Sequence, residues 1–223
     1  MYPAGNLFIP APHGRLEAIL KEPHGAEARG VALVLHPHPL HGGTMHNKVV
    51  FRTARGLNDA GLTTLRINFR GVGHSTGTHD HARGGEQEDA RLALDYLTEH
   101  YPNLPVLLAG FSFGARVGLE VGTYDERVRY LIGVGTPVSI EERDYDFSFL
   151  DDCRKPLLFV HGERDQFGDV ATLRALAARV PAEARARVTV IPAAGHFFDD
   201  QLEDLRHTVA EWAAEVLETE ARP

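Results

Sequence analysis

Short apolar runs alternate along the chain with longer segments in which apolar residues recur every three or four positions. Short runs rich in Val, Ile and Leu are typical of strands buried on both faces of a parallel sheet. The longer segments have the period of amphipathic helices. The expected strands are 7–9, 15–20, 31–35, 62–69, 106–109, 130–134, 157–160 and 188–191, and the expected helices are 47–60, 86–100, 114–122, 170–180 and 202–217.

This order of elements predicts an α/β fold with a mainly parallel central sheet and helices on both faces. The first two strands flank a turn at residues 12–14, so they are expected to form an antiparallel hairpin at the sheet edge. No linker, internal repeat or change of composition divides the chain. We therefore predict a single domain over residues 1–223.

Composition places the chain among ordinary globular proteins. Of its 223 residues, 43% are hydrophobic and 24% charged, which excludes disordered and collagen-like classes. A formal net charge of −8 argues against nucleic acid as a partner. No apolar run approaches the roughly 20 residues needed to span a membrane. One cysteine, Cys153, and an N-terminus without signal-peptide features favour a reducing compartment, and we expect the cytoplasm.

The 13 histidines raise the question of a metal site. Four of them lie within residues 36–46, a stretch without Cys, Asp or Glu, although zinc sites usually include such ligands. The Thr-His-Asp-His sequence at 78–81 begins like a metallo-β-lactamase motif but lacks the Asp-His that should follow. We expect neither a metal nor a cofactor.

A nucleophile motif stands out at residues 110–114, which read Gly-Phe-Ser-Phe-Gly and match G-x-S-x-G. The motif lies where an expected strand ends and an expected helix begins, as a nucleophile elbow requires. The turn is so tight that a Cβ at Gly110 or Gly114 would collide with its neighbours. Ser112 would then stand at the positive end of a helix, where the backbone N–H of Phe113 can donate to an oxyanion.

A serine nucleophile needs a histidine base and an orienting carboxylate, in the chain order Ser, Asp or Glu, His. Downstream of the serine, His196 follows the last strand in a glycine-containing loop, whereas His207 lies within the last helix and His161 ends a strand. Asp165, just beyond that strand, is the favoured acid. Asp169 is the alternative, although it could instead cap the following helix.

These motifs resemble the α/β-hydrolase superfamily. More narrowly, His-Pro-His-Pro at 36–39, Gly-Gly-Thr-Met at 42–45 and Asn-Phe-Arg-Gly at 68–71 are similar to a group of small bacterial α/β-hydrolases without a cap domain. The resemblance extends over residues 7–217. It implies an α/β-hydrolase fold without a cap, with Ser112 as the nucleophile, His196 as the base and Asp165 as the acid.

The resemblance also implies that the loop after strand 31–35 supplies a second oxyanion donor. Many relatives have glycine where this chain has Pro37, and the donor is the following backbone N–H, which here belongs to His38. Proline has no N–H and stiffens the loop. Pro39 cannot donate either, so Leu40 is the fallback.

On the substrate side, residues 136–155 form a stretch too short for an independent lid. Its apolar residues either belong to the core or line an acyl pocket, and the sequence leaves both open; they are Tyr145, Phe147, Phe149 and Leu150. The expected substrate-binding residues are Leu40, Met45, Phe111 and Phe197.

We therefore expect a serine hydrolase that cleaves carboxylic esters of small or medium acyl groups through an acyl-enzyme, with a small-molecule ester as its partner. The alternatives are an acyltransferase, thioesterase or peptidase of the same fold, or a non-catalytic or metal-binding module. The oligomeric state is left open.

Overall fold

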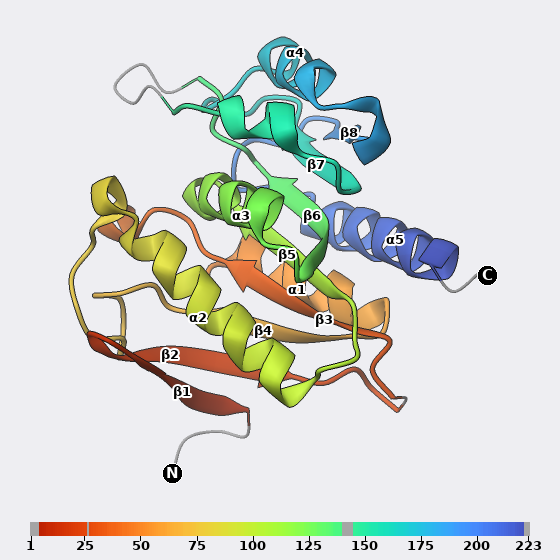
Figure 1. The fold of residues 1–223 in the computed structure, drawn as a ribbon. Helices are drawn as coiled ribbons and strands as arrows, with labels where there is room; N and C mark the ends of the chain where they lie inside the picture. The colour runs from red at the N-terminus through yellow and green to blue at the C-terminus, as the bar shows by residue number, and fades with distance from the viewer. Residues whose placement is uncertain (1–4, 26, 140–144, 221–223) are drawn as a thin grey trace.

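The computed structural model describes residues 5–25, 27–139 and 145–220, and these contain one eight-stranded sheet in the order β1-β2-β4-β3-β5-β6-β7-β8 (Figure 1). The strands are β1 (Asn6–Ala11), β2 (Gly14–Lys21), β3 (Gly30–Leu35), β4 (Leu62–Ile67), β5 (Val106–Phe111), β6 (Val128–Val134), β7 (Leu157–Gly162) and β8 (Arg187–Ile191). The helices are α1 (Lys48–Asp59), α2 (Gly85–His100), α3 (Phe113–Tyr124), α4 (Val170–Arg179) and α5 (Leu202–Glu220).

The sheet is parallel from β4 to β8 and antiparallel at one edge, where the hairpin β1–β2 joins it through β4. The central strands β3, β5 and β7 are buried at every position, which explains why they read as continuous apolar runs. The predicted α/β-hydrolase fold, with a mostly parallel sheet and an N-terminal hairpin, is confirmed.

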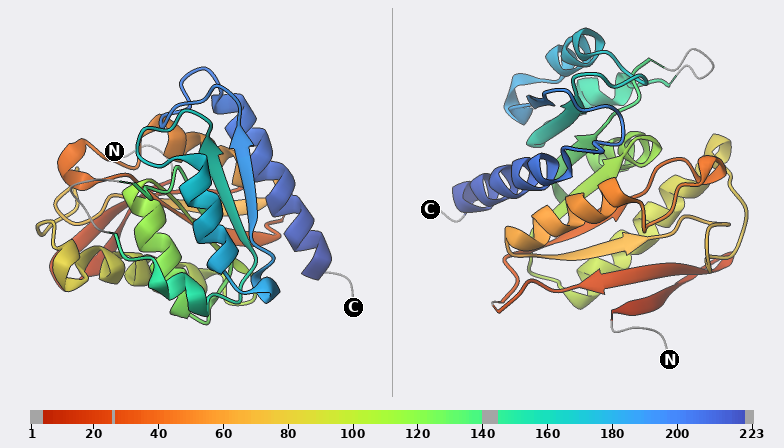
Figure 2. Two further views of the ribbon diagram at one scale, coloured as in Figure 1. Left: turned by 90° about the horizontal axis from the view of Figure 1, so that it is seen from above. Right: turned by 180° about the vertical axis from the view of Figure 1, so that it is seen from behind.

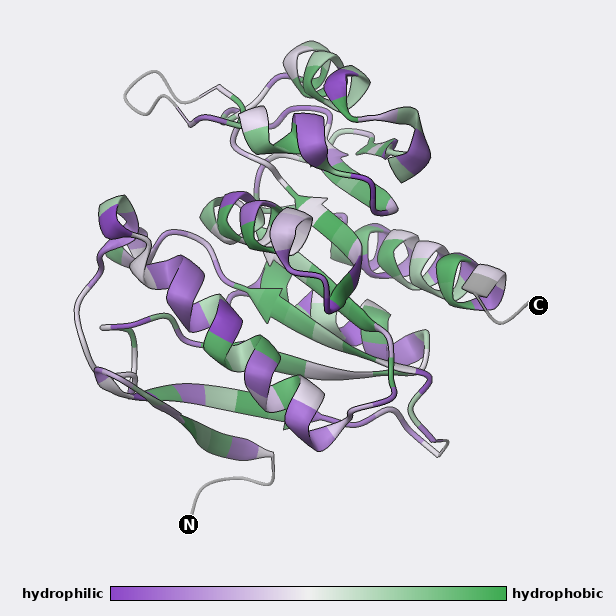
Figure 3. Cartoon of the chain, viewed as in Figure 1, coloured by the Kyte–Doolittle hydropathy of each residue, from purple (hydrophilic) through white to green (hydrophobic). Residues whose placement is uncertain are grey.

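Helices cover both faces of the sheet (Figure 2). Apolar side chains of α1 and α5 pack together on one face, and those of α2, α3 and α4 belong to a second core cluster on the other. Colouring by hydropathy shows the apolar strands between these layers, with polar residues on the outer sides of the helices (Figure 3). Each predicted helix and strand is present, with ends that differ from the expected ones by a few residues.

The carboxyl ends of the parallel strands lie at one edge of the sheet, so the loops after β3, β5, β7 and β8 are brought together there. In the described part of the connection between β6 and β7, the helical structure is one short 3-10 helix, η3 (Ser148–Asp152). Among the described helices, none has the length and apolar character needed to cross a membrane.

Candidate active site

The turn between β5 and α3 is the sharpest feature of this edge. Ser112 occupies it with φ 55° and ψ −119°, a backbone conformation that residues other than glycine rarely adopt. A Cβ on Gly110 would lie 2.1 Å from the carbonyl oxygen of Gly114, and a Cβ on Gly114 would lie 2.5 Å from the carbonyl oxygen of His36. The two glycines of the motif therefore allow the strand, the turn and the helix to approach closely.

Ser112 directly precedes α3, whose first residue is Phe113. The first N–H groups of a helix have no acceptor within the helix and carry a partial positive charge. The carbonyl oxygen of Ser112 is already used, because it accepts from the N–H groups of Ala115 and Arg116. The half-buried Ser112 side chain thus stands where developing negative charge is stabilised.

A buried acid–base pair lies on the two neighbouring loops. The Nδ1 atom of His196 lies 2.8 Å from Oδ2 and 3.0 Å from Oδ1 of Asp165. A carboxylate can only accept, so Nδ1 carries the proton and Nε2 is the basic nitrogen. The His196 residue is 3% exposed, which keeps water away from this hydrogen bond.

The loops that carry the pair are bonded to each other. The Arg164 N–H donates to the Ala194 carbonyl over 2.8 Å, and a Cβ on Gly162 would lie 2.5 Å from that same carbonyl oxygen. Asp165 is further held by the Phe167 N–H, which donates to its Oδ1 over 2.9 Å. The distance between the acid and the base is thus fixed by backbone contacts.

Three aromatic rings surround the His196 imidazole. The centroids lie 4.6 Å from Phe167, 4.8 Å from Phe111 and 5.2 Å from Phe197. Packing on several sides restricts rotation of the imidazole about its side-chain bonds. The ring is therefore held in the orientation that keeps Nδ1 on the carboxylate.

The other candidates for the triad have structural roles. Asp169 caps α4, since its carboxylate accepts from the backbone N–H of Thr172 over 2.9 Å. His161 is fully buried, and its Nε2 donates to the carbonyl oxygen of Gly168 over 2.6 Å. His161 therefore braces the loop that carries Asp165.

The loop after β3 lies beside the elbow. Its Pro37–His38 peptide is held by the buried His36 ring, whose Nδ1 lies 2.6 Å from the Pro37 carbonyl oxygen. The Phe69 N–H donates to Nε2 of the same ring over 3.0 Å, so Nδ1 carries the proton. Burial lowers the pKa of His36 to about 4, and the ring is neutral near pH 7.

The same ring thus orients the peptide unit that contains the His38 N–H. Gly43 also packs against this unit, because a Cβ there would lie 2.0 Å from the Pro37 carbonyl oxygen. The Leu40 N–H is already engaged, since it donates to Nδ1 of His38 over 3.2 Å.

These elements enclose a cavity of about 260 Å³, which we call the catalytic cavity. Ser112 and His196 both line it, together with His38 and Phe113. The remaining lining residues are Pro37, His41, Gly42, Gly43, Asn47, Pro137, Tyr145, Phe167 and Phe197. Asp165 lies behind His196 and is not part of the wall.

Of the expected substrate-binding residues, Phe197 lines the catalytic cavity and is 39% exposed. Phe111 and Met45 do not line it. Phe111 is 1% exposed and packs beneath the His196 ring, and Met45 is fully buried. Leu40 is 71% exposed and lines a neighbouring hollow instead.

The sequence left open whether the apolar residues before β7 belong to the core or line an acyl pocket, and the structure shows some in each place. Tyr145 lines the catalytic cavity, whereas Phe147, Phe149 and Leu150 are buried in the core. Sequence reasoning missed Pro137 and Phe167, which also line the cavity. The signal for Phe167 was its position two residues after Asp165.

The histidine-rich segments do not form a metal centre among the described residues, where no group of three or more His, Cys, Asp or Glu side chains is arranged to hold an ion. Near the elbow the imidazoles pack on one another and on Phe113 instead. The centroid of His38 lies 4.8 Å from that of Phe113, and the centroid of His81 lies at the same distance from it.

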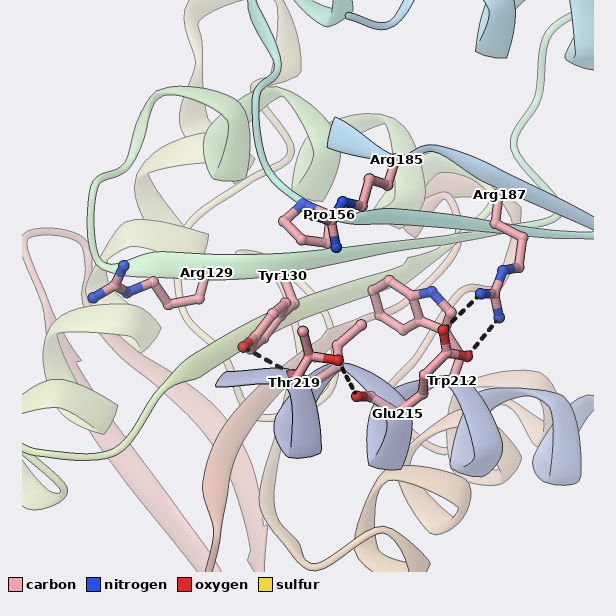
Figure 4. Close-up of a pocket in the computed structure, with 9 residues that line it drawn as sticks. Arg129, Tyr130, Pro156, Arg185, Arg187, Trp212, Glu215 and Thr219 are labelled. Atoms are coloured by element: carbon pink, nitrogen blue, oxygen red, sulfur yellow. Dashed lines mark hydrogen bonds and ion pairs between the residues drawn. The ribbon is translucent and has the colours of Figure 1, made fainter. Parts of the chain in front are cut away.

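Another cavity, of about 310 Å³, lies among the first residues of β6 and β8 and the last turns of α5 (Figure 4). Trp212 and Tyr130 line it, and the Arg187 guanidinium forms two hydrogen bonds of 2.8 Å with the Glu215 carboxylate. This cavity contains none of the predicted site residues.

Known proteins are similar to this chain over most of its length. Residues 31–221 match the model of the alpha/beta hydrolase domain family. An uncharacterized protein of Rickettsia prowazekii is 35% identical over 211 residues, which cover 93% of this chain and 87% of that protein.

Two solved structures are similar over nearly the whole chain. An alpha-beta serine hydrolase homologue from Coxiella burnetii has 36% identity and a TM-score of 0.85, covering 95% of this chain and 98% of its own. A serine hydrolase without a lid from Xanthomonas campestris has 32% identity and a TM-score of 0.83, and the match covers 95% of this chain and 94% of that protein. On the family model and on these relatives, the chain belongs to the alpha/beta hydrolase domain family, among serine hydrolase homologues without a cap.

Proposed function

We propose that the protein is a carboxylesterase of small or medium acyl esters that works through a Ser112–His196–Asp165 triad. The observation that carries this proposal is the catalytic cavity itself. Its wall contains a serine on a strained elbow and a histidine whose Nδ1 is 2.8 Å from a buried carboxylate. A serine, a base and an orienting acid are the groups that acyl transfer requires.

In the proposed reaction, Ser112 Oγ attacks the ester carbonyl carbon while Nε2 of His196 takes the hydroxyl proton. The C–O bond to the alcohol then breaks, and His196 returns the proton to the departing alkoxide. Water gives a proton to the same imidazole and attacks the acyl carbon. The bond from that carbon to Ser112 Oγ then breaks, His196 returns the proton to Oγ, and the acid is released. The carboxylate of Asp165 stabilises the imidazolium that forms at each step.

The negative charge on the carbonyl oxygen is held by backbone N–H groups. Phe113 offers one from the first turn of α3. For the second we propose His38 and not Leu40, because the Leu40 N–H already donates to the His38 ring. The bond from His36 to the Pro37 carbonyl preorganises that donor.

The walls of the catalytic cavity favour an uncharged acyl group of modest size. Phe113, Pro137, Phe167 and Phe197 provide an apolar surface. The volume of about 260 Å³ lies just below the roughly 300–1,000 Å³ typical of ligand pockets. We propose that the reaction takes place in the cytoplasm, which fits the free, buried Cys153.

Turnover of aryl esters tests the proposal. Purified protein is expected to hydrolyse p-nitrophenyl butyrate, and Ser112→Ala is expected to lower kcat by a factor on the order of 10⁶. Thioesters and aminoacyl amides of the same acyl group separate an esterase from a thioesterase or peptidase. Full activity of a folded Ser112→Ala variant would exclude the proposed nucleophile.

A further inference from the structure

The catalytic cavity adjoins a second hollow of about 520 Å³, which we call the outer hollow. His38 and Tyr145 line both. Its remaining wall combines the polar residues His79, His81, Arg116 and Asp146 with the apolar residues Leu40 and Ala82. Because the two spaces meet at the proposed oxyanion loop, an ester at Ser112 can extend from one into the other.

Arg116 is the most unusual residue of this wall. Its side chain is 9% exposed, and its Nη1 lies 2.8 Å from Oε2 of Glu120. Its Nε is buried and lacks a hydrogen-bond partner within the described part of the chain. The guanidinium carbon lies 4.6 Å from the centroid of the Phe149 ring, and this cation–π contact restricts the position of the guanidinium group.

A buried donor without an acceptor costs about 1–3 kcal/mol in an isolated protein. An unpaired buried donor is uncommon in native proteins, and it is satisfied by an ordered water or ion, or by a ligand group that reaches it. Arg116 reaches the site because it stands one helical turn after Ser112, and its backbone N–H donates to the Ser112 carbonyl over 3.1 Å.

The two histidines of the wall differ in how they are held. Nδ1 of His79 lies 2.8 Å from Oε1 of the buried Glu86. His81 has a buried Nδ1 without a hydrogen-bond partner among the described residues. Burial, and then the charge of Arg116, lower the pKa of His81, so near pH 7 the ring is neutral and has one donor and one acceptor.

Among the described residues around the outer hollow, carboxylates outnumber guanidinium groups. Glu120 neutralises Arg116, Glu86 faces His79, and the carboxylate of Asp146 lies in the wall itself. An anionic ligand would therefore meet no excess of positive charge, and an alkyl chain would leave the polar wall without partners. A hydroxyl group both donates and accepts, which suits a wall that offers both.

We infer that the outer hollow is a subsite for the alcohol portion of the ester, and that this alcohol is a neutral polyol such as glycerol or a sugar. The inference rests on the proposed esterase function. The acyl group would occupy the catalytic cavity, and the polyol would leave from the outer hollow with the proton that His196 returns.

Two butyrate esters of equal size test the inference. Glycerol 1-monobutyrate and pentyl butyrate have the same acyl group and alcohols of similar length, but only glycerol has free hydroxyl groups. The wild-type protein is expected to have a kcat/KM at least about tenfold higher for the glycerol ester, as a few hydrogen bonds of about 0.5–1.5 kcal/mol each would give.

Variants of the wall should reduce this preference. His81→Leu and Asp146→Ala are each expected to lower the ratio of the two kcat/KM values by about 3- to 10-fold. His207→Leu, an exposed histidine on α5, is the matched control and leaves the ratio unchanged. Circular dichroism of each variant confirms that it is folded.

Three results would overturn the inference. The first is that the wild-type protein hydrolyses both esters with nearly equal kcat/KM values. The second is that neither variant lowers the ratio of kcat/KM for the glycerol ester to that for the pentyl ester. In both cases the proposed esterase function stands. The third is a preference for the butyrate ester of glycerol 3-phosphate, which would assign the hollow to an anion. If no ester is hydrolysed and Ser112 resists acylation, the proposed function itself fails.

Discussion

Replacing Gly43 with alanine tests the oxyanion loop without removing any side chain. The added Cβ would lie 2.0 Å from the Pro37 carbonyl oxygen and 2.7 Å from the His38 carbonyl oxygen. Ordinary contacts of a Cβ begin at 3.4 Å, so relief of the closer contact requires a shift of about 1.4 Å. Both oxygens belong to backbone, and the Pro37–His38 peptide itself must move.

The size of the effect follows from the function proposed for this peptide. An oxyanion donor acts at about 2.7–3.1 Å, and a shift of more than 1 Å takes the His38 N–H out of that range. Loss of one such donor lowers kcat by about 10²- to 10³-fold. The KM is expected to change little, because the interaction forms mainly in the transition state.

Steady-state kinetics on p-nitrophenyl butyrate measure this change, with circular dichroism as the check on folding. Gly42→Ala is the matched control. A Cβ there meets nothing within 4 Å, although the φ of +77° makes alanine strained. Gly42→Ala should therefore lower stability but reduce kcat far less than Gly43→Ala. A folded Gly43→Ala protein with kcat within a few-fold of wild type would refute this explanation of the loop.

Two further predictions concern the buried polar groups. Asp165→Asn should lower kcat by up to about 10⁴-fold. An amide at this position favours the wrong tautomer of His196 and cannot stabilise the imidazolium as a carboxylate does. The kcat for an aryl ester measures the loss, and a decrease of less than tenfold would contradict the proposed role of Asp165. Burial lowers the pKa of His36 to about 4, below its ordinary 6.5. As the pH falls, the unfolded chain therefore protonates His36 before the folded protein does. The free energy of unfolding is expected to decrease by about 3 kcal/mol between pH 6.5 and pH 4. Urea titrations across this range should show a smaller decrease in His36→Asn, and an identical decrease would place the titration elsewhere.

Much of the fold could be predicted because its signals are local. The strand before the elbow is apolar at each position, the helix after it has a clear period, and the two glycines mark the tight turn. The chain order of Ser112, Asp165 and His196 then follows from the order of the strands.

The walls of the site were harder to predict, because they depend on side-chain direction and on contacts between distant loops. Phe111 belongs to the nucleophile motif, yet its ring packs beneath His196 and not in the cavity. Met45 lies in the proposed oxyanion loop but is buried, and its N–H donates to the Asn68 side chain over 2.8 Å. No local pattern distinguishes these orientations from exposed ones.

The role of His36 was also beyond local reasoning. The sequence places it at the end of a strand, beside three other histidines, which first suggested a metal site. Its function in the structure depends on the Phe69 N–H, from the loop that follows β4, and on the Pro37 carbonyl. Pro37 is the next residue in the chain, but only the pairing of β3 with β4 brings Phe69 to His36.

The most direct test of the central claim is to identify the residue that a fluorophosphonate modifies. The wild-type protein is expected to take up one phosphonyl group per chain, and peptide mass spectrometry should locate it on Ser112. The Ser112→Ala variant should remain unlabelled, and Asp165→Asn should react more slowly. A wild-type protein that stays unmodified, or that carries the label on another serine, would contradict the proposed active site.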